Sequence, residues 1–519
     1  MARSSFEGPP REPAPQPPTD GSSSEGGGEP GSEPLSTFRL AALIAGPALA
    51  ALVWLLPPPA DMSLEAWRLV SLASWMVVWW LGEAVPIPAT ALLPIPLMPI
   101  WGLGEMETVA ASYADPLIFL FLGGFLLAAA MQRWGLHRRI ALGIVRRAGT
   151  SPTGIIGGFM LATAFLSMWI SNTATTVMMF AVAISVVDFV GSRTADDATL
   201  RRFGVALMLA IAYSASIGGI GTLIGTPPNA LLASFLDSSY GISIDFFTWM
   251  LFGVPMVLVM LPIAWVLLTQ LVFSARGLGI GDASAVIREE LAALGPMSRG
   301  ERVVAGVLAA AALGWILRSQ LEAVTGLPIN DTSVALTAAL LLFAWPVSRT
   351  GGFALDWEAA RHVPWGVLLL FGGGLALASA FQSTGLAEWI GNTVGGFDIG
   401  TWLLILVVAA AIIYLTELTS NTASTATFLP ILGAVAVGLN LDPRLLAVPV
   451  AVGASMAFMM PVATPPNAIV FSYERMRLRD MAVAGFLLNI AAIGVTFAAM
   501  YYLAGPILGV ELPASPNDG

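Results

Sequence analysis

Apolar stretches long enough to cross a bilayer as helices, about 20 residues each, follow one another along most of this chain. Apart from Arg39 and Arg68, charged residues lie outside these stretches, and only 11% of the 519 residues are charged against 56% hydrophobic. A soluble domain carries about 25% charged residues. The predicted spans are 38–56, 66–82, 84–102, 116–132, 203–236, 249–274, 303–317, 332–346, 363–382, 445–472 and 481–508. The sequence therefore predicts an all-α polytopic membrane protein.

The same composition excludes several functional classes. The net charge is −10 and no basic stripe occurs, which argues against nucleic acid as a partner. The chain has no cysteine, and its two histidines, His137 and His362, lie in charged loop sequence, so disulfides, thiolate sites and a catalytic zinc are not expected. Residues 1–37 consist mostly of Pro, Gly, Ser and Glu and cannot bury enough surface to offset their ordering entropy. They are predicted to be a disordered cytoplasmic tail.

Arginine placement predicts the topology because cytoplasmic loops collect basic residues. Segments 133–147 and 193–202 are both rich in arginine, so the interrupted apolar region 153–190 starts and ends on one side, as a re-entrant hairpin does. A second interrupted region, 401–440, has acidic flanks and is predicted to be a hairpin entering from outside. The result is about 11 transmembrane helices, two opposed re-entrant hairpins and a cytoplasmic N-terminus, with a cytoplasmic connector at 276–302 and an external tail at 509–519.

Three sequence patterns occur twice in the same order. Because an odd number of spans separates the copies, the two halves are predicted to insert in opposite orientations, and inverted repeats with broken helices are typical of secondary transporters. The pairs are SNTATT at 171–176 with SNTAST at 420–425, GTPPNA at 225–230 with ATPPNA at 463–468, and FLGGFLLAAAMQRWGL at 121–136 with FGGGLALASAFQSTGL at 371–386.

The repeats give the predicted domain organisation. A first transmembrane helix at 38–62 precedes the first inverted repeat. The predicted parts are a first repeat at 63–275 with hairpin 153–190 and broken helix 203–236, and a second repeat at 303–508 with hairpin 401–440 and broken helix 445–472.

The repeated motifs place polar groups where apolar sequence surrounds them. Ser, Asn and Thr are favoured helix N-caps, and the free N–H groups of a helix start suit an anion. Side-chain oxygens and carbonyls freed by the Pro-Pro breaks suit a small hard cation. No arginine lies beside any of the four motifs, so a bound dianion needs cations as counter-charge, which predicts cation-coupled transport. Glu417, close to a hairpin tip, is interpreted as a cation or proton ligand or as a structural acid bonded to backbone.

The series SNT…GTPPN…SNT…ATPPN resembles the divalent anion:sodium symporter (DASS) family, which includes sodium-dependent dicarboxylate transporters. The resemblance covers about residues 38–508. It implies Na⁺ as the coupling ion, a homodimer with a scaffold and a transport domain in each protomer, and an elevator movement in the plasma membrane. All motif positions carry residues compatible with the family pattern.

The resemblance also implies the site residues. The first sodium site would use Ser167, Ser171, Asn172 and the Gly225 carbonyl, and the second Thr416, Ser420, Asn421 and the Ala463 carbonyl. The implied substrate-binding residues are Ser171, Asn172, Thr173, Thr226, Ser420, Asn421, Thr422, Thr464 and Pro465.

The expected function is sodium-coupled import of C4-dicarboxylates such as succinate, fumarate and malate. Within the same class, a sulfate or citrate symporter and a sodium-independent dicarboxylate exchanger remain open. An anion channel is the alternative from a different class, with a continuous pore and no need of a sodium gradient. The chain is not expected to be an enzyme, because neither histidine falls within a predicted span to supply a base or a metal ligand.

Overall fold

The computed structural model describes residues 37–149, 151–193, 196–274, 284–348, 352–394 and 400–511. The predicted tail before Thr37, part of the 276–302 connector and most of the 509–519 tail lie outside these residues. The helices of the first half are α1 (Thr37–Leu55), α2 (Leu64–Leu81), α3 (Ile87–Thr90), α4 (Pro94–Ile100), α5 (Met106–Ala111), η1 (Ser112–Ala114), α6 (Pro116–Arg133), α7 (Leu136–Arg147), α8 (Pro152–Ser167), α9 (Asn172–Gly191), α10 (Asp197–Gly219), α11 (Pro227–Tyr240), α12 (Phe246–Val266) and η2 (Leu267–Val272).

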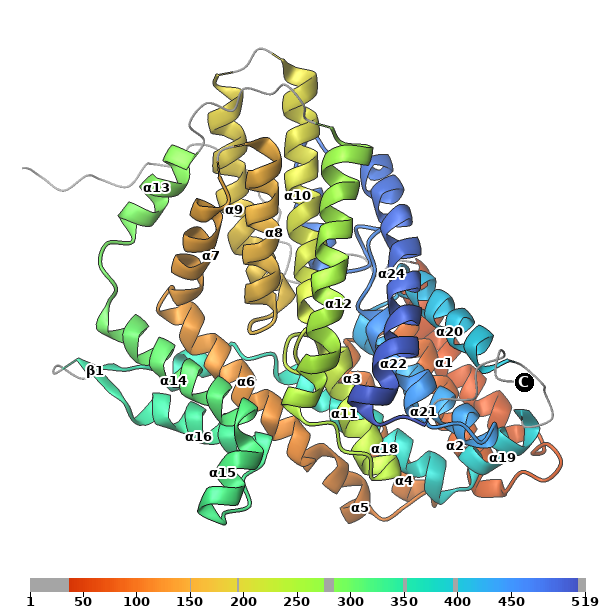
Figure 1. Ribbon diagram of the computed structural model, residues 1–519. Helices are drawn as coiled ribbons and strands as arrows, with labels where there is room; N and C mark the ends of the chain where they lie inside the picture. The colour runs from red at the N-terminus through yellow and green to blue at the C-terminus, as the bar shows by residue number, and fades with distance from the viewer. Residues whose placement is uncertain are drawn as a thin grey trace, which may run out of the picture. The chain divides into compact units, whose positions relative to one another are not determined.

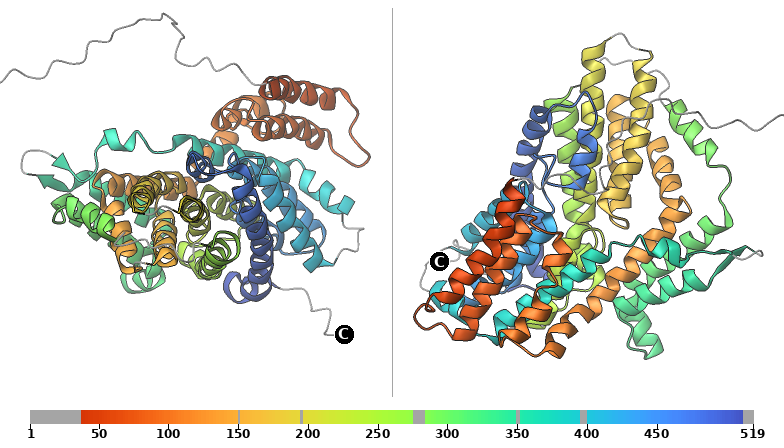
Figure 2. Two further views of the ribbon diagram at one scale, coloured as in Figure 1. Left: turned by 90° about the horizontal axis from the view of Figure 1, so that it is seen from above. Right: turned by 180° about the vertical axis from the view of Figure 1, so that it is seen from behind.

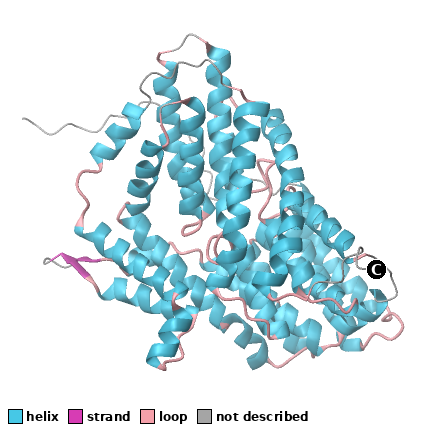
Figure 3. Cartoon of the chain, in the orientation of Figure 1, coloured by secondary structure: helices cyan, strands magenta, loops and turns pink. Residues whose placement is uncertain are grey.

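The second half continues in the same way (Figures 1 and 3). Its elements are α13 (Ser284–Ala293), α14 (Arg299–Ile316), α15 (Arg318–Thr325), α16 (Asp331–Ala344), β1 (Pro346–Ser348), β2 (Gly352–Phe353), α17 (Trp357–Ala360), α18 (Trp365–Ser383), α19 (Leu386–Val394), α20 (Thr401–Thr416), α21 (Asn421–Gly438), α22 (Arg444–Ala454), α23 (Pro465–Phe471) and α24 (Leu478–Leu508). The predicted all-α class is confirmed. The antiparallel pair β1–β2 is the one strand ladder in the described part of the chain.

Eight helices among the described residues are long and apolar enough to cross a membrane, and several shorter apolar helices accompany them. The total of about 11 spans depends on the shorter and bent elements and stays a prediction. Two predicted boundaries are wrong. The first helix ends at Leu55 rather than at residue 62, because prolines 57–59 follow it. The span at 84–102 is split into α3 and α4, because proline-rich sequence cannot sustain one helix.

Helix α10 forms the centre of the described core. In its most apolar window 89% of the residues are buried. Helix α8 packs closely against it, because Gly218 has no side chain to hold it away from the backbone of Ala164. Helices α1 and α2 run side by side (Figure 2), where Gly46 fits against the rings of Trp75 and Trp79. Small residues therefore set the close helix contacts, as they do in membrane bundles.

Ion pairs join segments that the arginine pattern assigns to one side of the membrane. Arg139 binds Glu301 at 2.6 Å, and Arg133 binds Asp356 at 2.6 Å; all four belong to segments predicted to be cytoplasmic. The pairs Arg201–Asp480 and Arg475–Asp197 do the same for the segments that follow α9 and α23. Elsewhere Arg318 pairs with Asp245 and Asp331, and Arg444 pairs with Asp442. The pairs are compatible with the predicted topology, which stays a prediction.

Candidate functional site

Two helix–turn–helix pairs carry the SNT motifs at their tips. In the first pair α8 ends at Ser167 and α9 begins at Asn172; in the second α20 ends at Thr416 and α21 begins at Asn421. Each tip is thus a four-residue turn at the same place in the motif. The far ends of α9 and α10 lie at the top of Figure 1, and the α8–α9 tip lies near the middle. That the two pairs enter a bilayer from opposite sides stays a prediction.

The first tip brings three oxygen atoms together. The Ser167 hydroxyl lies 2.5 Å from Oδ1 of Asn172 and 2.7 Å from the carbonyl oxygen of Ala215 on α10. A hydroxyl has a single hydrogen, so it can donate to one of these two oxygens at a time. Ser167 is fully buried, and the cluster lies at the end of α8 and the start of α9. Such a group of neutral oxygens is suited to a small hard cation.

The second tip repeats this arrangement at the motif residues. The Thr416 hydroxyl lies 2.9 Å from Oδ1 of Asn421 and 3.1 Å from the carbonyl oxygen of Ala454, the last residue of α22. Thr416 is also fully buried. In both repeats, therefore, a buried hydroxyl one turn before the tip connects the motif asparagine to the last turn of the first half of a broken helix.

The two broken helices are interrupted immediately before their prolines. The gaps are residues 220–226 and 455–464, and Pro227 and Pro465 begin the second halves, where a missing N–H costs nothing. The asparagine of each PPN motif binds the freed carbonyls. Nδ2 of Asn229 donates to the carbonyls of residues 219, 220 and 222, and Nδ2 of Asn467 donates to those of residues 457 and 460. The sequence prediction did not include these two asparagines, although both copies of the motif carry them.

Of the remaining predicted cation ligands, Gly225 lies close to the first cluster. Gly219 is in close contact with Asn172, since a Cβ there would lie 2.8 Å from Oδ1, and Gly225 in turn packs on the carbonyl of Gly219. A side chain at residue 219 would therefore collide with the Asn172 amide. In the second repeat Ala463 is buried and bonds through its N–H to the Met460 carbonyl at 3.2 Å. The hydroxyl and amide oxygens at each tip are of the kind that suits a sodium ion, and the two complete sodium sites stay a prediction.

The predicted substrate residues, four of which are also predicted cation ligands, differ in accessibility. Ser171 and Thr173 are exposed, and Asn172 and residues 420–422 are half-buried. Thr226 and Thr464 are buried at the starts of α11 and α23, and Pro465 is exposed. At each tip the motif residues are thus more accessible than the hydroxyl of Ser167 or Thr416 that precedes them.

The helix starts differ in their caps. The Ser171 hydroxyl accepts from the N–H of Ala174 at 3.3 Å, and that of Thr464 accepts from the N–H of Asn467 at 3.2 Å. At Ser420 and Thr226 no side-chain cap forms. The first-turn N–H groups of α21 therefore keep more of their capacity for a ligand. Helix α11 offers none, because Pro227 and Pro228 have no N–H and the N–H of Asn229 bonds to the Thr226 carbonyl at 3.2 Å.

The two repeats are interlaced. The second arm of each hairpin packs on the second half of the other repeat's broken helix: α9 contacts α23, and α21 contacts α11. The first arms pack within their own repeat, α8 on α10 and α20 on α22. Among the described residues no hydrogen bond joins the two tips, so a single central site formed by both tips stays a prediction.

Glu417 is a structural acid in this structure. The residue is 3% exposed, and its carboxylate accepts hydrogen bonds from the N–H groups of Phe458, Met459 and Met460 and from Nδ2 of Asn489, at 2.7–3.0 Å. Of the two interpretations of this residue, the geometry supports the acid bonded to backbone. Its pseudo-equivalent in the first repeat is Met168.

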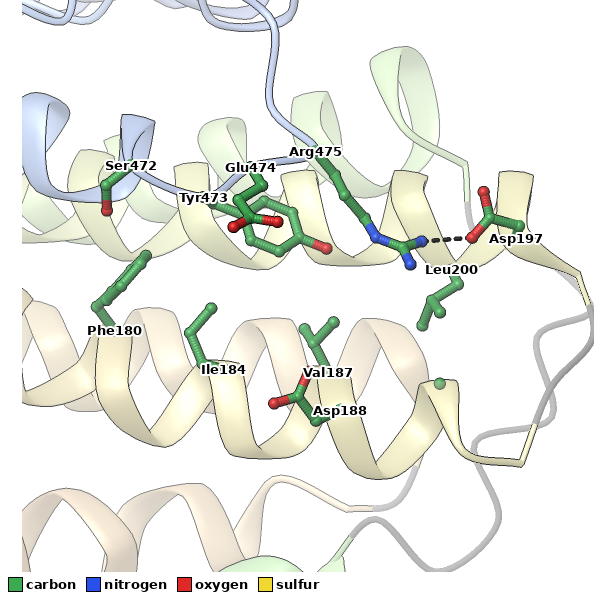
Figure 4. Close-up of a pocket in the computed structure, with 11 residues that line it drawn as sticks. Phe180, Ile184, Val187, Asp188, Asp197, Leu200, Ser472, Tyr473, Glu474 and Arg475 are labelled. Atoms are coloured by element: carbon green, nitrogen blue, oxygen red, sulfur yellow. Dashed lines mark hydrogen bonds and ion pairs between the residues drawn. The ribbon is translucent and has the colours of Figure 1, made fainter. Parts of the chain in front are cut away.

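A cavity of about 750 Å³ lies away from the tips, between α9 and the segment that follows α23. Figure 4 shows Asp188 and Glu474 on facing walls and the ion pair between Arg475 and Asp197 at one end. The described residues contain no group of three or more His, Asp or Glu side chains that could hold a metal ion. The chemistry of the tips therefore rests on hydroxyls, amides and backbone.

Comparison with known proteins places the chain in a family. The family profile described as "Sodium:sulfate symporter transmembrane region" matches residues 37–508. The chain is 40% identical over 482 residues to the "Sodium-dependent dicarboxylate transporter SdcS" of Staphylococcus saprophyticus, covering 91% of this chain and 93% of that protein. It is 38% identical over 491 residues to the protein of the same name from Staphylococcus aureus strain MRSA252, covering 92% and 94%.

A solved structure shows the same fold. The Alcanivorax borkumensis YdaH transporter, whose crystal structure is described as revealing an unusual topology, superposes with a TM-score of 0.56 at 14% identity. The match covers 83% of this chain and 98% of that one. These relatives are transporters rather than enzymes. The chain therefore belongs to the sodium:sulfate symporter family, the divalent anion:sodium symporters whose paired motifs its hairpin tips carry.

Proposed function

We propose that this protein is a sodium-coupled symporter that imports C4-dicarboxylates such as succinate, fumarate and malate. The observation that carries the proposal is the pair of matched tips, in which the buried residues Ser167 and Thr416 each bring a hydroxyl, an asparagine oxygen and a backbone carbonyl together. Two cations held there supply the positive charge that a dianion needs and that no nearby arginine provides. The names of the staphylococcal relatives support the same coupling ion and substrate class.

The proposed sites use the residues of the two tips and the two helix breaks. The first sodium is held by Ser167, Ser171, Asn172 and the Gly225 carbonyl, and the second by Thr416, Ser420, Asn421 and the Ala463 carbonyl. One substrate carboxylate meets the tip of α8–α9 and the other meets the tip of α20–α21, with the free N–H groups of the helix starts contributing. The substrate residues are Ser171, Asn172, Thr173, Thr226, Ser420, Asn421, Thr422, Thr464 and Pro465.

Transport on this proposal uses alternating access of the site. The interlaced elements α8–α11 and α20–α23 form a unit that carries the bound ions and anion, and an elevator movement of that unit in a homodimer moves them across the plasma membrane. The N-terminus lies in the cytoplasm. The close packing of α9 on α23 and of α21 on α11 supports a unit that moves as one piece.

Sulfate is the second candidate substrate, because the matching family profile is named for sodium:sulfate symport. Sulfate is also a dianion and uses the same counter-charge argument. Sulfate, however, is a single tetrahedral oxyanion. It has no two separate anionic groups of which one could contact each tip, as the two carboxylates of a C4-dicarboxylate do. Competition of sulfate or citrate against labelled succinate separates these substrates.

The test is uptake of labelled succinate into proteoliposomes with and without an inward sodium gradient. Saturable uptake that requires sodium is the expected result. Uptake that needs internal dicarboxylate but no sodium would assign the protein to the exchangers. A sodium-independent current that does not saturate would indicate a channel. Sodium-driven uptake of sulfate without uptake of succinate would show that sulfate is the substrate. Sodium would remain the coupling ion.

A further inference from the structure

The two repeats differ in how they satisfy the backbone at the break of the broken helix. In the first repeat the N–H groups of Ile220 and Gly221 bond back to helix carbonyls at 3.2 and 2.9 Å. At the equivalent positions in the second repeat, 238 residues later, Phe458 and Met459 direct their N–H groups to the Glu417 carboxylate, and Met460 does the same. An unpaired N–H in a buried position costs about 1–3 kcal/mol. Glu417 therefore replaces a set of backbone acceptors with one charged side chain.

The geometry shows a carboxylate that only accepts. Oε1 receives the N–H groups of Phe458 and Met459 and the Asn489 amide, and Oε2 receives those of Met459 and Met460. No ion pair among the described residues includes Glu417. All of its donors are neutral, so its negative charge is held in place by hydrogen bonds but is not cancelled by a cation from the protein.

This charge lies beside the second proposed cation site. Glu417 follows Thr416 directly in the chain, at the tip that holds Asn421. The Met460 peptide connects it to the other half of the site. Its N–H binds Glu417, and its carbonyl accepts from Ala463 and from Asn467. One side chain thus joins the α20–α21 tip, the α22–α23 break and, through Asn489, helix α24.

The first tip has no such group. Its equivalent residue is Met168, whose carbonyl accepts from the Thr222 hydroxyl at 2.5 Å and whose side chain packs on Gly221. There the connection between tip and break is neutral and made by hydroxyl and backbone. The two cation sites are therefore matched in their oxygens but not in the charge beside them.

We propose that Glu417 is a positioning residue that fixes the second tip to its break and, through its uncompensated charge, makes the second cation site the tighter of the two. The proposal rests on the proposed sodium-coupled function. Glu417 acts through Thr416, Asn421 and the Met460–Ala463 backbone and does not itself hold the ion. A sodium ion at this tip is attracted by the buried charge more strongly than one at the Met168 tip.

The test measures sodium binding without transport. Purified full-length protein is heated over a series of NaCl concentrations, with choline chloride keeping the ionic strength constant, and the sodium concentration that gives half of the thermal stabilisation is recorded. We expect Glu417→Gln to raise this midpoint by about tenfold, a change of ~1.4 kcal/mol in the binding free energy. Glu301→Gln, which removes a buried carboxylate far from the tips, is the matched control and leaves the midpoint unchanged.

Two backgrounds separate positioning at one site from a general structural effect. In Ser167→Ala, where the second site remains, Glu417→Gln still raises the midpoint. In Thr416→Ala the second site is already damaged. Adding Glu417→Gln to this variant leaves its sodium midpoint unchanged, because the two changes act on the same site. Equal shifts in both backgrounds, or no shift in the wild-type background, would overturn the proposal.

If Glu417→Gln does not fold, Glu417→Asp decides the question. It keeps the charge but is too short to reach all three N–H groups, so the expected midpoint rises by a few-fold. A wild-type midpoint in this variant would overturn the positioning role. If the wild-type protein itself shows no thermal response to sodium, sodium coupling is contradicted, and this proposal fails with it. A wild-type response with an unshifted Glu417→Gln leaves the proposed function intact.

Discussion

The hydroxyl of Ser167 lies 2.5 Å from Oδ1 of Asn172, across the tip of the α8–α9 pair, and the same contact recurs at 2.9 Å between Thr416 and Asn421. Each asparagine also uses its carbonyl, which accepts from the hydroxyl of Thr176 or of Thr425 at 2.8 Å. The asparagine is thus fixed by both its backbone and its side chain. This rigidity suits an oxygen that must coordinate an ion.

Replacing either tip asparagine by alanine is expected to abolish sodium-driven uptake while leaving a folded protein. Asn172→Ala and Asn421→Ala each remove an oxygen that the cation and the anion share, and both side chains are only half-buried, so the packing loss is small. Uptake in proteoliposomes and elution on size exclusion check this result. Wild-type uptake by either folded variant would refute the site assignment.

A methyl group at Gly219 is expected to disrupt the first cation site. A Cβ at this residue would lie 2.8 Å from Oδ1 of Asn172, closer than real Cβ contacts, so the amide must move. Gly219→Ala should raise the sodium midpoint of thermal stabilisation several-fold. Gly494→Ala is the control, since it lies within helix α24 with open space around its Cβ. Identical sodium midpoints in the two variants would contradict the position of this site.

Single cysteines test the orientation of the two hairpins, because the chain has none of its own. Ser192→Cys lies at the exposed end of α9, and Gly400→Cys lies in open space before α20. We expect a membrane-impermeant thiol reagent to label them from opposite sides in oriented vesicles. The cysteine-free parent gives the background. Labelling of both from one side would rule out opposed hairpins.

The Arg139–Glu301 pair is expected to give the fold a pH-dependent contribution. Burial raises the pKa of Glu301, but hydrogen bonds from Arg139 and Ser298 outweigh it, so the pKa lies below its usual 4.5. A lowered folded-state pKa stabilises the fold above the unfolded pKa, and this stabilisation is lost as the pH falls through the folded pKa. Glu301→Gln should cost about 2 kcal/mol near neutral pH, with the difference in Tm from wild type shrinking below about pH 4.5.

The control for this measurement is Glu358→Gln. Glu358 pairs with Arg361 on the surface at 2.9 Å, and both side chains are mostly exposed, so the pair contributes little. Its Tm should stay close to the wild-type value at every pH. If the difference in Tm between wild type and Glu301→Gln stays constant down to the lowest pH measured, the charge of the Glu301 carboxylate is not the cause of that difference.

Much of the fold could be predicted because the motifs that mark turns and helix breaks occur twice in the chain. The two SNT copies mark the tips, and the two PPN copies mark the starts of α11 and α23, each to within a residue or two. Ser167 and Thr416 were expected at the tips because the family resemblance implies them, four residues before Ser171 and Ser420. The limits of the other spans were less certain. Prolines end α1 early and separate α3 from α4. Where several prolines lie close together, the sequence does not show at which of them the helix will end.

The contacts that complete the site could not be predicted. Glu417 meets N–H groups more than 40 residues away, and no local pattern shows that a break will leave them unpaired. The roles of Asn229 and Asn467 depend on carbonyls that are free only after the helix has ended. The α9–α23 and α21–α11 contacts cross between repeats. Such pairings are set by tertiary packing, which motif spacing does not encode.

The ion pairs of Arg201 with Asp480 and of Arg475 with Asp197 have a consequence for synthesis of the protein. Arg201 and Asp480 are 279 residues apart in the chain, so the first hairpin and α10 leave the ribosome long before their partners exist. At 5–20 residues per second the delay is roughly 15–55 seconds. During that time α9 lacks α23, and its polar tip has no second repeat to cover it. During synthesis the first half is therefore in the membrane without its partner helices. The surfaces that the second half will cover contact lipid or the insertion machinery until then.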